Sequence, residues 1–180
     1  MVSAADMLAL AAFEEGMYAQ SFPTFGSERT GSPVISFCRV DAHPIRIHDP
    51  ITEPDALIVQ DPTLIHQVRL FDGVAAGALV LINTSHSFAD LGLARLEQQV
   101  DPTRVCCIPA TELARAELGR ALPNTALLGA FAAMTGLVSP EALHSAIRQT
   151  FPEPLASRNV SVAQAAYRRV FDQRQEASRA

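Results

Sequence analysis

Short apolar runs bounded by polar or proline residues recur through the middle of the chain. Three of them lie at residues 56–59, 77–82 and 105–108. A continuous apolar run of this length is typical of a strand buried on both faces of a parallel sheet. Helical patterns separate or follow the runs, at residues 62–70, 87–99 and 110–119. The alternation predicts an α/β fold with three layers, in which helices flank a mostly parallel sheet.

The chain opens on a helical pattern at residues 3–16, ahead of every strand signal. Ser3 is suited to cap this helix, Asp6 is suited to be its capping-box partner, and Gly16 is suited to end it. An α/β fold that begins with a helix is unusual, because the helix is expected to follow a strand.

Residues 17–32 show no helical period and contain two glycines, one proline and three aromatic residues. Such a composition predicts an elaborate loop. Residues 34–40 then predict a strand, and residues 44–48 predict a second short strand that pairs with it in a hairpin. Functional residues concentrate on loops held by rigid elements, so the segment 17–32 is the first candidate for a site.

The C-terminal third is predicted to be helical. Its clearest start signal is Ser139, a capping residue followed by proline and glutamate. A last helix is predicted at residues 159–177, after a connector at 152–158 that contains two prolines. The sequence has no internal repeat and no Gly/Ser-rich linker. Residues 1–180 are therefore expected to form a single domain, in which 152–180 supply the connector and the terminal helix.

Composition excludes several classes of function. The net charge of −5 and the pI near 5.5 disfavour nucleic acid as a partner, because phosphate binding needs a basic face. All 14 basic residues are arginine, which excludes a Schiff-base lysine and a P-loop lysine. The sequence shows no signal peptide and no apolar stretch near the length of a membrane span. A cytoplasmic protein without a membrane partner is expected.

The common catalytic and metal-binding motifs are absent from the sequence. There is no G-x-S-x-G, no H-x-x-x-H and no G-x-G-x-x-G. The three cysteines, Cys38, Cys106 and Cys107, form no C-x-x-C pair, whereas an iron–sulfur cluster needs four suitably spaced thiolates. The adjacent pair is interpreted as reduced cysteines of a buried strand, with a redox pair as the alternative. No catalytic residue and no metal ligand is predicted.

One charged pair remains as a candidate for binding. Glu28 and Arg29 lie between Gly26 and Gly31, and the guanidinium of Arg29 is able to fork onto a phosphate or a carboxylate. The alternative is that the pair only braces an interface. The residues by themselves therefore lead to an α/β domain with one unusual loop.

That loop also carries a resemblance to a known family. Residues 15–34, EGMYAQSFPTFGSERTGSPV, closely resemble the pattern E-G-K-Y-A-Q-x-F-P-x-F-G-x-E-R-x-G-x-P-V of the gamma subunits of pyruvate (2-oxoacid):ferredoxin oxidoreductases. Further similar blocks follow in the family's order: P-I-R at 44–46, P-D at 54–55, D-P-T-L at 61–64 and P-N-T-A-L-L-G-A-F at 123–131. The similarity extends from residue 1 to about residue 151.

The resemblance implies an enzyme subunit that is inactive alone. The whole complex would oxidise a 2-oxoacid, pyruvate by similarity, with coenzyme A to an acyl-CoA and carbon dioxide, and would pass electrons to ferredoxin. Thiamine diphosphate, Mg²⁺ and [4Fe–4S] clusters are expected on partner subunits of alpha, beta and delta type or their fused equivalents. Two alternatives are a purely structural assembly subunit and a subunit specific for another 2-oxoacid, such as 2-oxoisovalerate or 2-oxoglutarate.

The resemblance also names residues for a site. The candidates for contact with coenzyme A or with a partner subunit are Tyr18, Gln20, Phe25, Gly26, Glu28, Arg29, Gly31, Asn124 and Thr125. Members of the family open with a strand and a turn of the form G-x-G-G-Q-G-V, which this sequence lacks before its first helix. A missing first strand is therefore expected. A start codon placed late is favoured over true loss, because loss would expose apolar edges.

Overall fold

A computed structural model describes residues 2–24, 34–66, 69–93, 100–177 and 179. The helices are α1 (Val2–Glu14), α3 (Ala110–Leu118), α4 (Asn124–Thr135), α5 (Pro140–Thr150) and α6 (Leu155–Ala177). The strands are β1 (Tyr18–Thr24), β2 (Ile35–Asp41), β3 (Ala56–Val59), β4 (Leu79–Asn83) and β5 (Val105–Ile108). Short 3₁₀ turns lie at η1 (Pro62–His66), η2 (Ala89–Leu91) and η3 (Pro102–Arg104).

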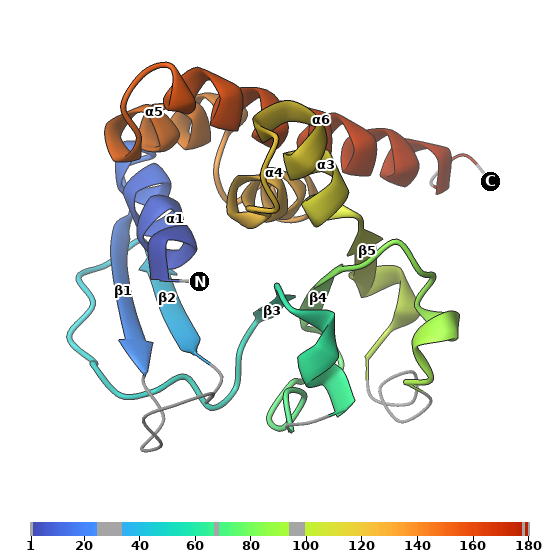
Figure 1. Ribbon diagram of the computed structural model, residues 1–180. Helices are drawn as coiled ribbons and strands as arrows, with labels where there is room; N and C mark the ends of the chain where they lie inside the picture. Colours follow the sequence, from blue (N-terminus) through green and yellow to red (C-terminus); the bar gives the residue numbers. More distant parts are fainter. Residues whose placement is uncertain (1, 25–33, 67–68, 94–99, 178, 180) are drawn as a thin grey trace.

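The strands form two separate sheets. Strands β3, β4 and β5 lie side by side in parallel in that order, which confirms the three strands and the α/β class predicted from the apolar runs. Only β4 is largely buried, whereas β3 and β5 are mostly half-buried. Strands β1 and β2 form an antiparallel ribbon of their own. Helix α1 lies against this ribbon, while α3, α4 and α6 lie above the parallel sheet (Figure 1).

The parallel sheet has an apolar layer on each face. Leu81 of β4 faces the helices, whereas its neighbours Val80 and Ile82 pack with Ile65 and Leu93 on the opposite face. Leu81, Val80 and Ile82 are all at most 1% exposed. This alternation is the expected two-residue period of a strand with a core on both sides.

The layer opposite the α-helices consists of short turns. The prediction of a helix at 62–70 is therefore wrong for its first part. Residues 62–66 form the 3₁₀ turn η1. The carboxylate of Asp61 accepts hydrogen bonds from the backbone nitrogen and the hydroxyl of Thr63, at 3.0 and 2.7 Å, and so stabilises a tight turn. A helix was also expected at 87–99. In this range the structure has the three-residue turn η2, and residues 94–99 lie outside the described part.

The hairpin predicted from the sequence has the wrong partner strand. Strand β2 pairs with β1, in register from Tyr18 opposite Asp41 to Thr24 opposite Ile35, and residues 44–48 form no strand. The segment predicted as a loop from residue 17 is therefore a strand up to Thr24. Pro23 is tolerated because, among the described strands, β1 pairs with β2 alone and is an edge strand.

Helix α1 also begins differently from the prediction. It starts at Val2, so Ser3 lies inside the first turn and does not cap it. The hydroxyl of Ser3 accepts a hydrogen bond from Asn124, and the carboxylate of Asp6 accepts one from Ser21. Tertiary contacts have thus replaced the predicted capping box. The helix ends at Glu14, and Gly16, the predicted stop residue, follows with a φ of 77° in the left-handed region that favours glycine.

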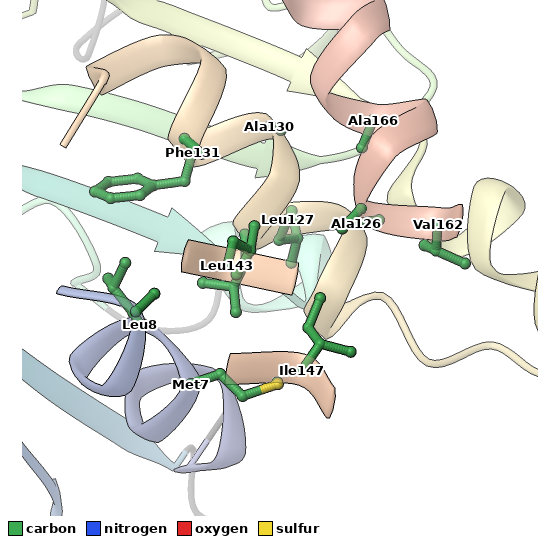
Figure 2. Packing of buried hydrophobic residues seen from close by; sticks show 14 of the residues in the cluster. Met7, Leu8, Ala126, Leu127, Ala130, Phe131, Leu143, Ile147, Val162 and Ala166 are labelled. Carbon is green, nitrogen blue, oxygen red and sulfur yellow. The ribbon is translucent and has the colours of Figure 1, made fainter. Parts of the chain in front are cut away.

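The helical C-terminal third is confirmed, with one change of boundary. The Ser139 hydroxyl accepts a hydrogen bond from the backbone nitrogen of Ala142 at 3.1 Å and caps α5, with proline in the first turn. Helix α6 begins at Leu155, four residues before the predicted start, so part of the expected connector is helical. Figure 2 shows side chains of α1, α4, α5 and α6 meeting in one core.

Candidate functional site

The outward face of the β1–β2 ribbon carries a network of polar and aromatic side chains. Gln20 and Arg39 are paired positions of the two strands. The Gln20 side-chain amide is hydrogen-bonded to Nδ1 of His48. The guanidinium of Arg39 lies 5.5 Å from the centre of the Phe22 ring, a cation–π geometry.

Arg39 also ties the following loop to the ribbon. Its guanidinium donates to the carbonyl oxygens of Ile47 and Asp49, at 3.2 and 2.5 Å. Together with the Gln20–His48 contact, these bonds hold residues 47–49 of the segment 44–49, here called the strap, across the outward face. The P-I-R block, at residues 44–46, comes just before these contacts and forms no strand.

Two of the nine predicted site residues lie on this ribbon. Tyr18 and Gln20 share the outward face of β1, because they are two residues apart on a strand. Tyr18 is 48% exposed at the start of the strand. Five further candidates lie outside the described residues, namely Phe25, Gly26, Glu28, Arg29 and Gly31. Strand β1 leads directly into the segment that contains them.

The last two candidates, Asn124 and Thr125, lie in the first turn of α4. Asn124 donates from Nδ2 to the hydroxyl of Ser3 at 3.0 Å. Thr125 is fully buried, and its hydroxyl donates to Oδ1 of Asn159 on α6 at 3.0 Å. Asn159 is 4% exposed and donates in turn to the Leu155 carbonyl. The contact of Thr125 is therefore with α6.

Helix α1 connects the two groups of candidates. Ser3 bonds Asn124, and Asp6, one helical turn further, accepts from the hydroxyl of Ser21 on β1 at 2.5 Å. The start of α4 and the inner face of the ribbon therefore meet the same end of α1. Tyr18 and Gln20 face the other way, so the structure does not bring all four residues into one site.

The site contains residues that the sequence did not single out. Arg39 and His48 make the contacts that order its outward face, yet neither belongs to a recognisable motif. If residues 18–24 had been predicted as a strand, Arg39 and His48 would have been expected beside the family-like block at 15–34. The missed signal is the alternation of Tyr18, Gln20 and Phe22 with smaller residues.

Hydrogen bonding and burial shift the pKa values of two ionisable groups on the ribbon. Hydrogen bonds from the backbone nitrogen and side chain of His43 lower the pKa of Asp41 at the end of β2. Burial, and then the nearby Asp6 carboxylate, raises the pKa of the Cys38 thiol to about 11. Cys38 is therefore a neutral thiol at physiological pH and a poor nucleophile.

The cysteines do not fit an iron–sulfur cluster. Cys106 and Cys107 are neighbours on β5 and pack into the cores on opposite faces of the sheet, so their thiols point apart. Cys38, the third cysteine, lies on the separate ribbon. Within the described residues, no group of three or more His, Cys, Asp or Glu side chains is arranged to hold a metal ion. Nor do those residues include a helix long and apolar enough to cross a membrane.

Comparison with known proteins decides the family. Residues 1–169 match the model of the pyruvate ferredoxin/flavodoxin oxidoreductase family. The chain belongs to this family. It is 43% identical to the pyruvate/ketoisovalerate oxidoreductases common subunit gamma of Thermococcus kodakarensis, over 92% of this chain and 88% of that protein. It is 40% identical to the pyruvate synthase subunit PorC of Methanothermobacter marburgensis, over 94% and 90%.

A solved structure of the family has the same fold. The crystal structure of pyruvate oxidoreductase subunit PORC from Thermotoga maritima matches with a TM-score of 0.76 and 31% identity, covering 93% of this chain and 88% of that chain. The family resemblance predicted from the sequence blocks is thereby confirmed.

Proposed function

We propose that this chain is the gamma subunit of a 2-oxoacid:ferredoxin oxidoreductase, with pyruvate as the substrate of the complex. The complex would convert the 2-oxoacid and coenzyme A to acyl-CoA and carbon dioxide, with two electrons passing to ferredoxin. One observation carries the proposal: relatives at least 40% identical over more than nine tenths of the chain are gamma or PorC subunits of pyruvate oxidoreductases.

The redox chemistry is assigned to partner subunits. The positions of the three thiols argue against an iron–sulfur cluster held by this chain. Thiamine diphosphate, Mg²⁺ and the [4Fe–4S] clusters would be bound by companion subunits of alpha, beta and delta type. This chain would then help to close and orient the site that those cofactors occupy.

The outward face of the ribbon is proposed as the surface that meets a companion subunit. Three exposed apolar side chains lie on or beside it: Tyr18 at 48%, Ile35 at 48% and Ile47 at 59%. Exposed apolar groups around a rigid polar network are typical of an interface. The bonds from Arg39 to the 44–49 strap would keep this surface in one shape before the partner arrives.

A second role concerns coenzyme A. In the sequence after β1, Arg29 lies between Gly26 and Gly31, and a guanidinium is well suited to bind a phosphate in two hydrogen bonds. Arg29 would then bind a phosphate of coenzyme A.

Reconstitution tests the gamma-subunit proposal. The companion subunits are assayed for 2-oxoacid oxidation and ferredoxin reduction with and without this chain, and complexes are sized by gel filtration. We expect full activity only with the chain present. Ile47→Arg should weaken assembly, whereas Phe171→Arg, at an exposed position on α6, serves as the matched control. Equal activity without the chain would reject the proposal, and equal assembly of both variants would reject the ribbon as interface.

A further inference from the structure

The parallel sheet has an open edge at β5. Among the described strands, β5 pairs with β4 alone, and residues 105–107 are half-buried although most of β4 is buried. The carbonyl oxygen of Ile108 accepts a hydrogen bond from the backbone nitrogen of Thr84, directly after β4, at 2.9 Å. Successive residues of a strand present their backbone groups to opposite edges, so those of Val105 and Cys107 point to the open edge. Within the described residues, neither of these two makes a backbone hydrogen bond outside the sheet.

A cleft follows this edge below the C-terminal half of α6. Its volume is about 280 Å³, under the roughly 300–1000 Å³ of small-molecule sites. The cleft is separate from the larger groove between the two sheets, which β2 and β3 line. It is lined by residues 105–107 of β5 and, among others, by Met134, Val170, Gln173 and Arg174. Figure 1 shows α6 continuing past β5, so the helix extends over the space beside the edge. An open strand edge under a helix suits one added strand.

The cleft has a basic character. Arg174 lines it, and the described residues that line it include no acidic side chain. Burial and the neighbouring Cys107 raise the pKa of the Cys106 thiol to about 11, while the positive charges of Arg174 and Arg169 act in the opposite direction. Both guanidiniums therefore contribute a positive potential to the cleft. An acidic segment complements this potential. A second copy of the chain does not, because a twofold pairing of β5 edges would bring the two Arg174 side chains together.

We propose that the β5 edge binds an extended acidic segment of a companion subunit, which adds a strand to the parallel sheet. The backbone groups of Val105 and Cys107 would pair with this segment, and a carboxylate of the segment would meet Arg174. In this mode of recognition main-chain hydrogen bonds supply affinity and side-chain pockets supply specificity. The proposal rests on the gamma-subunit role for the source of the segment. The edge belongs to a different sheet from the ribbon, so the chain would contact its companions at two places.

Amide hydrogen exchange at single-residue resolution tests the pairing. The probe is the set of companion subunits, and the chain is compared free and in the reconstituted complex. The amides of Val105 and Cys107 should exchange roughly tenfold or more slowly in the complex. The amides of Cys106 and Ile108 point to β4 and are the internal control, because their exchange should be slow in both states.

A charge reversal tests the acidic character of the segment. Arg174→Glu should weaken the affinity of the chain for the companion subunits by roughly tenfold or more, because it would set a carboxylate against the carboxylate of the segment. Arg168→Glu makes the same change of charge at an exposed position on α6 that does not line the cleft, and should have little effect. Circular dichroism of both isolated variants verifies that they fold.

The possible outcomes separate this proposal from the gamma-subunit role. Unchanged exchange of Val105 and Cys107 in an assembled, active complex would overturn the added strand and leave that role intact. Equal effects of the two charge reversals would overturn the acidic segment. Protection of the two amides in the free chain that disappears on dilution would assign the edge to a second copy. A chain that neither joins the companion subunits nor supports 2-oxoacid oxidation would overturn both proposals. If Arg174→Glu does not fold, the exchange comparison of the unmodified chain decides alone.

Discussion

Single residues in the family-like block at 123–131 have packing roles in this structure. Asn124 ties α4 to α1, Thr125 ties α4 to α6, and Gly129 lets α6 approach closely. A motif that resembles a family signature thus consists here of contacts between helices. Motif identity by itself does not distinguish such a role from ligand binding.

Thr125→Val should destabilise the fold by about 1–3 kcal/mol, because Oδ1 of the buried Asn159 would lose its donor. Urea unfolding followed by circular dichroism measures the change. Thr125→Ser keeps the hydroxyl and should retain most of the stability. Equal loss in both variants would mean that the methyl group, and not the hydrogen bond, matters.

Arg29→Ala tests the coenzyme A role of the loop. If Arg29 binds a phosphate, the apparent KM for coenzyme A should rise roughly ten- to hundredfold, equivalent to about 1.5–3 kcal/mol for a charged hydrogen bond. The KM for the 2-oxoacid should barely change, and Arg29→Lys should restore only part of the effect. Loss of subunits on gel filtration, without a selective coenzyme A defect, would instead assign the residue to the interface.

At the scale of elements, Gly129 allows α4 and α6 to pack closely against each other. A Cβ built on Gly129 would lie 2.1 Å from the carbonyl oxygen of Ala163, and no side-chain motion relieves a clash with backbone. Both helices are also lined with alanines, including Ala126, Ala130 and Ala166 (Figure 2). The helical third therefore depends on small residues at one crossing.

Gly129→Ala should destabilise the protein by at least about 1–3 kcal/mol, because the two helices must separate. Gly77→Ala is the matched control: its Cβ would meet nothing within 4 Å, so stability should be unchanged or slightly higher. Thermal unfolding of both variants gives the comparison. Similar midpoints for the two would contradict the close crossing.

The junction between α1 and α5 should depend on pH. Glu15 accepts a hydrogen bond from the backbone nitrogen of Ser139 at 2.9 Å, and bonds from Ser139 lower the pKa of Glu15. A carboxyl with a lowered folded-state pKa stabilises the fold above its unfolded-state pKa, and this contribution disappears as pH falls through the folded-state value. Glu15→Gln should therefore cost stability at neutral pH and nothing in acid. Glu117→Gln, at an exposed site on α3, is the matched control.

At the scale of the whole molecule, the chain has the open surfaces expected of a subunit of a larger complex. It carries an open groove between its sheets, and exposed apolar side chains on its ribbon. Its relatives are named as subunits of larger oxidoreductases. These features agree with a protein that completes its surfaces in a complex.

The purified chain alone should be colourless, bind no thiamine diphosphate and show no oxidoreductase activity. The physical reason is the placement of its thiols on two sheets and on opposite faces, which prevents a shared cluster. Visible absorption spectroscopy, with binding and activity assays of the purified chain, is the measurement. A stoichiometric cluster spectrum in the folded chain would contradict the assignment of the cofactors to partners.

The sequence by itself determined several elements of the fold, because burial and helix ends produce recognisable patterns of apolar, capping and glycine residues. The apolar runs gave β3, β4 and β5, the Ser139 signal gave the start of α5, and Gly16 gave the end of α1. It also determined the family, because several spaced blocks matched in order. These features depend on neighbours in sequence, and a single chain displays them directly.

Only the tertiary structure decided which strands pair and which side chains contact each other within the chain. The pairing of β1 with β2, the strap held by Arg39, and the removal of Ser3 and Asp6 from a local cap all join residues far apart in the sequence. Local propensity could not reveal them, because a strand at the surface shows a weak alternation and a polar side chain takes whichever partner the fold brings. The groove beside β3 likewise arises only when separate elements are set side by side.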